Sequence, residues 1–253
     1  MIAAITHQGR TWRIALDQPI DLSLPLDPDS PGPRAWYVGA PAFTPVNDGE
    51  RTYTVQDGAP VNFRNVQFNP HGNGTHTESV GHIARTIHPV GNLFQRYWFT
   101  AQLVSVPPQE RRTPAGTARV ITLEQLQSTV HERAPEALVV RTRPNGEDKR
   151  TRQWTDTDPP FMEAEACRWL RGIGVRHLLL DLPSVDRERD EGQLAAHHAF
   201  WDFPRTTDLG RTITEMIFVP DTVRDGDYLL ELQVPHFIND AAPSRPLLYA
   251  PRP

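Results

Sequence analysis

The sequence is poor in cysteine, in long apolar runs and in excess positive charge, and each shortage excludes a class of protein. The chain has 253 residues and one cysteine, Cys167, which rules out an intramolecular disulfide and any cysteine-based metal cluster. No stretch approaches the roughly 20 apolar residues that a membrane-spanning helix needs. The formal net charge of -5 offers no general attraction to nucleic acid or to an anionic membrane. We therefore expect neither a nucleic-acid nor a membrane partner.

The beginning of the chain also lacks the apolar stretch of a secretion signal. Residues 1–16 include glutamine, arginine and tryptophan where such a signal is apolar, so a cytoplasmic location is expected. The 25 prolines are spread along the chain instead of being gathered in one segment, which indicates many turns and short strands. Because neither a repeat nor a linker is visible, we expect one domain over residues 1–253.

Hydrophobic periodicity predicts alternating strands and helices in the second half of the chain. Residues 99–106 and 137–140 have the composition of strands, and residues 175–182 form a third apolar run. Thr122 to Gln125 has the form of a capping box at a helix start. A second helix is expected to open at residues 158–160, with Cys167 packed on its apolar face. Strand, helix and strand in succession favour an α/β layer.

The most informative stretch runs from Asn69 to His82 and contains three histidines, a glutamate and several glycines. His76 and Glu78 are two residues apart, so their side chains leave the same face of an extended strand. His82 is an even number of residues away from both, so its side chain joins theirs on this face if the strand continues or bends after Gly81. Imidazole and carboxylate groups on one face suit a divalent ion of the zinc or manganese type. A polar loop whose histidines bond to nearby backbone is the alternative.

The region before this stretch predicts short strands and an aromatic group. Strands are expected at residues 53–55 and 61–68, leading into the histidines. Trp36, Tyr37 and Phe43 lie around a Gly-Ala-Pro turn. Such aromatic side chains pack in a core or form the wall of a site for a flat apolar substrate, and the sequence leaves both roles open.

Further motifs follow the histidine-rich stretch in a fixed order: Asp181 to Asp186, His197-His198, Glu215, Asp225 to Tyr228 and Ser244-Arg245-Pro246. Together with Asp21-Leu22-Ser23 near the start and Gly74 to Glu78 with His82, this order resembles the cyclase family of metal-dependent hydrolases over nearly the whole chain. The resemblance implies an α/β fold of the swivelling β/β/α type, with a β-barrel-like sheet core and helices packed outside. It also implies assembly as a homodimer or homotetramer.

The family's site residues can be carried over one by one. They imply one or two zinc ions, with manganese as the alternative, held by His71, His76, Glu78, His197 and Glu215. His71 and His76 would hold one ion and His197 the other, with the two glutamates shared or adjacent. His197 is preferred to His198 because the matching family position is the first of the pair. His82 is then the free acid/base of the reaction.

Three departures from the family pattern fall in the central motif, and one of them is Val80 in place of the family's proline. The family's bridging aspartate is Glu78 here, which is longer by one methylene group. The family's first histidine stands four residues before His76, where this chain has Gly72. His71 lies one position earlier, so it either reaches the metal through a bulged turn or has been lost as a ligand. The glycines at 72 and 74 permit the bulge, which we favour.

The resemblance implies a metal-dependent amidohydrolase that cleaves an amide, a formamide or a cyclic acyl compound with metal-activated water. Its most specific version is arylformamidase activity, the hydrolysis of N-formylkynurenine to kynurenine in tryptophan catabolism. Trp36 is the candidate substrate-binding residue. A non-catalytic metal- or small-molecule-binding protein on the same fold is the alternative. The shifted His71 and the change from aspartate to glutamate at position 78 are its support.

Overall fold

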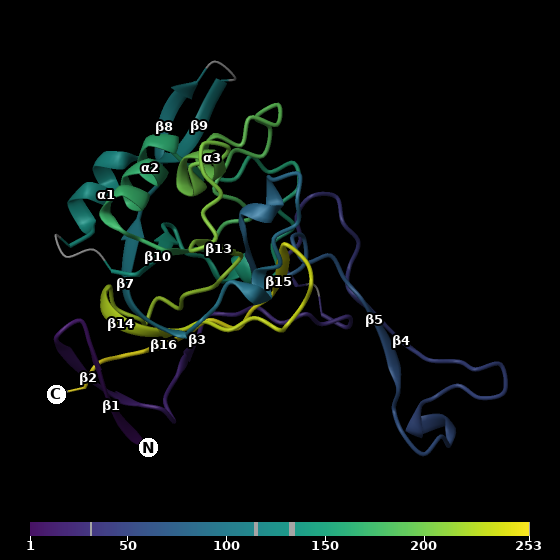
Figure 1. The fold of residues 1–253 in the computed structure, drawn as a ribbon. Coiled ribbons are helices and arrows are strands. Elements are labelled where there is room, and N and C mark those ends of the chain that lie inside the picture. Colours follow the sequence, from purple (N-terminus) through teal and green to yellow (C-terminus); the bar gives the residue numbers. More distant parts are fainter. Residues whose placement is uncertain (31, 114–115, 132–134, 253) are drawn as a thin grey trace.

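A computed structural model describes residues 1–30, 32–113, 116–131 and 135–252. Its centre is a nine-stranded mixed sheet in the order β15-β6-β13-β12-β10-β7-β14-β16-β3 (Figure 1). These strands are β3 (Ile20–Asp21), β6 (His76–Glu78), β7 (Trp98–Val106), β10 (Ala137–Thr142), β12 (His177–Leu180), β13 (Thr212–Glu215), β14 (Gly226–Glu231), β15 (Ala241–Pro243) and β16 (Leu247–Tyr249).

Smaller sheets and helices surround this sheet. The additional strands are β1 (Ile2–His7), β2 (Arg10–Ala15), β4 (Ala42–Pro45), β5 (Arg64–Gln67), β8 (Gln109–Thr113), β9 (Gly116–Ile121) and β11 (Phe161–Met162). The α-helices are α1 (Leu123–Thr129), α2 (Ala164–Ile173) and α3 (Ala195–Trp201). Short 3-10 helices are η1 (Val55–Asp57), η2 (Val80–His82), η3 (Val90–Asn92) and η4 (Glu147–Arg150).

The central strands are apolar at most positions because both faces of the sheet are covered. Val140 of β10 and Leu180 of β12 pack into a core that includes buried residues of all three helices. Val139 and Leu179, one position earlier, belong to a second core on the opposite face. The three helices lie together on one side of the sheet (Figure 1), and α2 joins the parallel strands β10 and β12. The predicted α/β fold with helices outside a curled sheet is confirmed.

Several local predictions are also confirmed. The hydroxyl of Thr122 accepts a hydrogen bond from the Gln125 amide, and the Gln125 side chain accepts one from the amide of Thr122. Gly174 ends α2 in the left-handed conformation, with a φ of 101°. Cys167 is fully buried on α2, where burial raises its thiol pKa well above the ordinary value, so a packing role fits this residue.

Two predicted elements are wrong. The helix expected to open at residues 158–160 begins at Ala164, because Phe161 and Met162 form β11 and pair in parallel with β9. The β8–β9 hairpin that provides this pairing had not been anticipated. Residues 53–55 form no strand, and Val55 begins η1 instead. Residues 64–67 do form the strand β5 expected in that region.

The segment from Ala42 to Gln67, here called the arm, extends away from the rest of the molecule (Figure 1). Among the residues that the structure describes, its strands β4 and β5 pair only with each other. The first metal-site candidates, His71, His76 and Glu78, follow the end of β5 in the chain. Within the described ranges, every helix is too short or too polar to cross a membrane.

Candidate metal centre

Two neighbouring strands carry the first part of the site. β6 lies between β13 and β15, and the antiparallel register with β13 places Glu215 directly opposite His76. Nε2 of His76 is 3.3 Å from Oε2 of Glu215, and both side chains are buried. Glu78 is two positions beyond His76 on β6, so both side chains leave the same face of the strand, as predicted. The early segment with His76 and the late segment with Glu215 are therefore neighbouring strands.

The turn before β6 explains why a histidine stands one position away from the family pattern. A Cβ atom added to Gly72 would lie 2.5 Å from Cγ2 of Val38 and 3.0 Å from the carbonyl oxygen of Ala35. No side chain fits at this position without movement of its neighbours. The side chain of Asn69 accepts hydrogen bonds from the amides of His71 and Gly72, which fixes the turn. From this turn His71 reaches Glu78, with its Nδ1 atom 3.1 Å from Oε2 of the glutamate.

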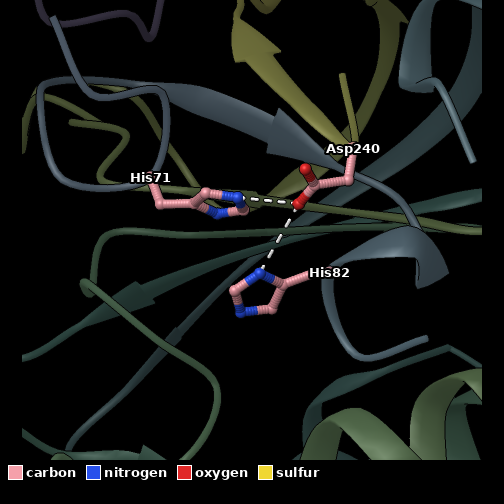
Figure 2. A group of neighbouring side chains, drawn as sticks. All are labelled: His71, His82 and Asp240. Carbon is pink, nitrogen blue, oxygen red and sulfur yellow. Dashed lines mark hydrogen bonds and ion pairs between the residues drawn. The ribbon is translucent and has the colours of Figure 1, made fainter. Parts of the chain in front are cut away.

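His71 bridges two carboxylates. Its Nδ1 lies 3.1 Å from Oε2 of Glu78, and its Nε2 lies 2.8 Å from Oδ2 of Asp240 (Figure 2). Burial acts to lower the pKa of His71, but the hydrogen bonds to these carboxylates outweigh it and raise the pKa to about 10. Asp240 has its pKa lowered by the same contact, against the effect of its own partial burial.

His82 reaches the site because the chain bends after β6 into η2. The Ser79 hydroxyl accepts a hydrogen bond from the Gly81 amide and starts this turn. Nδ1 of His82 then lies 3.8 Å from Oε2 of Glu78 and 3.7 Å from Oδ2 of Asp240. Its other ring nitrogen points away from Asp240 (Figure 2). The imidazole is about one-third exposed, so it is open to a bound molecule.

His197 enters from α3 and is held by Asp186. The Asp186 carboxylate accepts hydrogen bonds from the amides of Ala196 and His197 and lies 2.6 Å from Nδ1 of His197. This contact turns Nε2 of the imidazole toward Oε1 of Glu78, at 3.1 Å. Burial alone would lower the pKa of His197, but the two carboxylates raise it to about 10. His198, the second of the pair, bonds instead to the carbonyl oxygen of Phe203.

The two buried glutamates differ in charge environment. Burial raises the pKa of Glu215, and the nearby negative charge of Glu78 raises it further. Burial would also raise the pKa of Glu78, but the positive charges and hydrogen bonds of His82, His197 and His71 hold it well below the ordinary value. Glu78 is therefore the anionic centre around which the histidines gather.

A cavity of about 180 Å³ opens onto this group of side chains. It is lined by His71, Glu78, His82, His197 and Glu215 together with Trp36, Ser184, Asp186, Arg187, Glu188, Asp190 and Leu194. Trp36, the substrate-binding candidate, thus borders the same space as the histidines. Ser184 does too, but its hydroxyl accepts a hydrogen bond from the Asp186 amide and belongs to a turn.

The side chains present fit a divalent metal ion. Among the described residues, Nε2 of His76 is one of three buried side-chain nitrogens without a hydrogen-bond partner, although Glu215 is 3.3 Å away. Three overlapping groups of residues bring one candidate ligand atom each to within 4.8 Å of one another. These groups are His71, His76 and Glu78; Glu78, His82 and His197; and His71, His82 and Asp240. Imidazoles and carboxylates without sulfur are typical ligands of zinc or manganese.

Asp240 is the site residue that the sequence did not predict. It lies one position before β15, and β15 reaches the site only because it pairs with β6. The Asp240 carbonyl oxygen also accepts a hydrogen bond from the Ser79 amide. No local motif marks this residue, so only knowledge of the strand pairing would have identified it. Asp186 belongs to the motif from Asp181 to Asp186, but the motif does not predict its contact with His197.

The chain is similar to known proteins in sequence and in fold. The model of a family described as putative cyclase matches residues 20–187. A kynurenine formamidase of Bacillus cereus is 29% identical over 170 residues, which cover 64% of this chain and 75% of that enzyme. The kynurenine formamidase of Bordetella avium is 26% identical over 226 residues, or 85% of this chain and 97% of that enzyme.

A similar fold occurs in solved structures. Isatin hydrolase A from Ralstonia solanacearum superposes with a TM-score of 0.66 and 15% sequence identity, and the match covers 92% of each chain. At this level of identity the likeness concerns the fold alone. The family match ends before α3, so His197, Glu215 and Asp240 lie beyond the matched residues and are placed by the structure.

Proposed function

The chain belongs to the putative cyclase family, and on this basis we propose that it is a metal-dependent hydrolase of an amide, a formamide or a cyclic acyl compound. The observation that carries the proposal is the cross-strand pair of His76 and Glu215, in which a buried imidazole nitrogen lacks a hydrogen bond beside a buried carboxylate. An ion coordinated there would satisfy both groups.

The proposed ligands are those that the family resemblance implies: His71, His76, Glu78, His197 and Glu215. Glu78 is placed to be shared, because its two carboxylate oxygens face different histidines: Oε1 faces His197 and Oε2 faces His71. When bound, a divalent ion polarises a substrate carbonyl and lowers the pKa of bound water toward 7. One or two zinc ions are proposed, with manganese as the alternative.

His82 is the proposed acid/base. The carboxylates of Glu78 and Asp240 lie on the Nδ1 side of the ring, at 3.8 and 3.7 Å, while the other nitrogen is left for the reacting molecule. A histidine arranged in this way can accept a proton from the attacking water and donate it to the leaving nitrogen. Asp240 faces both histidines, with its Oδ2 atom 2.8 Å from Nε2 of His71 and 3.7 Å from Nδ1 of His82.

Trp36 is the proposed contact for the apolar part of the substrate, since it lines the cavity beside the histidines. Similarity to kynurenine formamidases supports an aromatic amide. The most specific form of the proposal is hydrolysis of N-formylkynurenine. This substrate is suggested by relatives that are less than 30% identical to the chain. The same assay therefore includes isatin, the cyclic amide after which the enzyme of similar fold is named.

The direct test measures metal content and turnover together. Purified protein is analysed for zinc and manganese and then assayed with N-formylkynurenine, isatin and a panel of other amides, lactones and esters. We expect bound metal and hydrolysis that disappears on chelation and returns with metal. Bound metal without turnover on the whole panel would leave a non-catalytic metal-binding protein. The absence of both would refute the proposal.

A further inference from the structure

Another cavity, here called the aromatic cavity, lies away from the metal centre. Its volume is about 510 Å³, and among the described residues it shares none of its lining with the cavity beside the histidines. Its lining includes Phe94, Arg96, Phe99, Arg176, His177 and Leu209. Pockets of about 300–1,000 Å³ with a mainly apolar lining are the usual size of sites for small molecules.

The sheet separates the aromatic cavity from the metal centre. His177 pairs with Thr212 at the start of β13, whereas Glu215 is at the end of that strand. Leu179, two positions after His177, belongs to the core on the side away from the helices. Ile213, two positions before Glu215, belongs to the core on the helix side. Because side chains two apart on a strand share a face, the two sites lie on opposite faces of the sheet.

Aromatic rings around a neutral histidine form the wall of this cavity. His177 is 5% exposed, and its ring centroid lies 5.6 Å from that of Phe94 and 4.1 Å from that of Phe99. Burial lowers the pKa of His177 to about 3, so the ring is uncharged at neutral pH. Leu209 adds an apolar side chain that is 43% exposed. Such a wall suits a flat, aromatic molecule.

One ring nitrogen of His177 is left for a ligand. Nδ1 lies 2.9 Å from the hydroxyl oxygen of Thr212, whereas Nε2 has no hydrogen-bond partner among the described residues. The Thr212 hydroxyl can donate to Nδ1, and a neutral ring that accepts there carries its hydrogen at Nε2. Since this almost wholly buried residue lines the aromatic cavity, a ligand oxygen in the cavity is the partner that Nε2 lacks.

The charge of the aromatic cavity is positive. Within the described part of the chain, its charged lining residues are two arginines, with no carboxylate beside them. Arg96 is already neutralised by an ion pair with Glu136. Arg211, which follows a lining residue in the chain, pairs with Asp208. Arg176 is exposed and forms no ion pair with a described carboxylate, so its charge is left for an anionic ligand.

We propose that the aromatic cavity is a second binding site, which takes a small aromatic carboxylate. The ring of the ligand packs against Phe94, Phe99 and Leu209, and its carboxylate pairs with Arg176. The guanidinium group matches a planar carboxylate in geometry as well as in charge. Nε2 of His177 donates a hydrogen bond to a further oxygen of the ligand.

The reaction at the metal centre would itself supply such a ligand, and this step rests on the proposed function. Hydrolysis of isatin consumes one water, breaks the ring C–N bond and forms a C–O bond. The product, isatinate, carries a carboxylate, a keto oxygen and a free aromatic amine. Its keto oxygen is an acceptor for Nε2 of His177 that benzoate does not have. The product of the reaction and an unrelated aromatic acid are therefore distinguishable ligands.

The first test is calorimetric titration of the full chain with benzoate. We expect one site per chain, with equal affinity in the wild type, in Glu215→Gln at the metal centre and in Arg168→Gln, an exposed arginine on α2. Arg176→Gln should lower the affinity by about 10–100-fold, because hydrogen bonds to a charged group are lost. No saturable binding to the wild type, or an unchanged affinity in Arg176→Gln, overturns the proposal. Loss of binding in Glu215→Gln alone would place benzoate at the metal centre and overturns it too.

The second test asks which property of the ligand is recognised. Benzamide has the same ring without the charge and should bind about 10–100-fold more weakly than benzoate. Leu209→Asp adds a negative charge to the lining at a partly exposed position and should weaken benzoate binding, whereas Leu209→Asn, its neutral counterpart, should weaken it less. Both variants should keep the wild-type circular dichroism. Equal affinities for benzamide and benzoate, or for the two variants, overturn the recognition of an anion.

The third test identifies the source of the ligand. Isatinate is titrated into Glu215→Gln, in which the metal centre is altered and the aromatic cavity is intact. One added hydrogen bond should make isatinate bind about 2–10-fold more tightly than benzoate. An affinity no higher than that of benzoate overturns the reaction product as the ligand. None of these titrations uses turnover, so an inactive protein that binds benzoate would refute only the proposed function.

Discussion

Glu215 lies directly opposite His76 on the neighbouring strand, with its Oε2 atom 3.3 Å from Nε2 of the histidine. The side chains are 4% and 0% exposed, so water cannot take the place of a partner for either group. A buried imidazole nitrogen without a hydrogen bond is costly, at about 1–3 kcal/mol. A cation held between β6 and β13 removes this cost, which links the stability of the site to its chemistry.

Gly72 should tolerate no larger residue. In Gly72→Ala the new methyl group meets Val38 and the carbonyl oxygen of Ala35, and overpacking of this kind lowers the free energy of unfolding by about 1–3 kcal/mol. The control is Gly172→Ala on α2, where the added carbon meets nothing within 4 Å and alanine is the better helix former. The measurement is the urea unfolding midpoint of Gly72→Ala and of Gly172→Ala. Equal midpoints for the two variants would contradict the steric explanation.

His82→Gln should separate catalysis from metal binding. Loss of an acid/base group lowers the turnover number by about 10²–10⁴-fold. We expect the zinc content to stay at the wild-type level, because His82 is not among the proposed ligands. His131→Gln, at a side chain 62% exposed, serves as the control and should change neither quantity. Loss of metal along with turnover would make His82 a ligand instead.

Asp186→Asn tests how His197 is positioned. The carboxylate lies 2.6 Å from Nδ1 of His197 and accepts hydrogen bonds from two backbone amides at the start of α3. Its replacement therefore weakens the contact that orients the imidazole ring. Replacing a residue that hydrogen-bonds to a metal-bound histidine lowers the metal affinity by about 10–100-fold. Calorimetric titration with zinc should show a loss of this size, and Asp57→Asn on the arm should show none. An affinity equal to wild type, with only the unfolding midpoint lowered, would limit Asp186 to a structural role.

His177 should make stability depend on pH. Burial lowers the pKa of this residue to about 3, and its ring packs against Phe94 and Phe99. As the pH falls below 6.5, the unfolded chain binds a proton that the folded chain excludes, so stability decreases with decreasing pH. Between pH 7.5 and 5 the loss is about 2 kcal/mol.

The comparison variant for this effect is His177→Asn, which has no titrating group at the position. Urea unfolding is measured for both proteins at pH 7.5 and pH 5. The stability of the wild type relative to the variant should fall by about 2 kcal/mol between the two pH values. A relative stability that is the same at both pH values would show that His177 is protonated in the folded protein.

Much of the site could be predicted because its key spacing is local. Two-residue periodicity is enough to place His76 and Glu78 on one face of a strand. The α2 crossover followed from an amphipathic stretch between two apolar strands. The convergence of Glu215 with His76 came from the family resemblance, and the strand register accounts for it.

The remaining features depend on pairings that no short window of sequence contains. Asp240 joins the site only through the pairing of β15 with β6, and β11 forms only because β9 is beside it. The direction of the arm is likewise invisible in its composition. Cytoplasmic location, a single domain over residues 1–253, and the homodimer or homotetramer stay predictions.

The most direct test of the metal centre is the zinc content of the wild type and of Glu215→Gln, measured by mass spectrometry of purified, dialysed protein. We expect one or two zinc ions per wild-type chain, and a loss of at least one of them in the variant. Glu147→Gln, at an exposed glutamate, should bind as the wild type does. Equal zinc content in wild type and Glu215→Gln, or no zinc or manganese in the wild type, would contradict a cation held between His76 and Glu215.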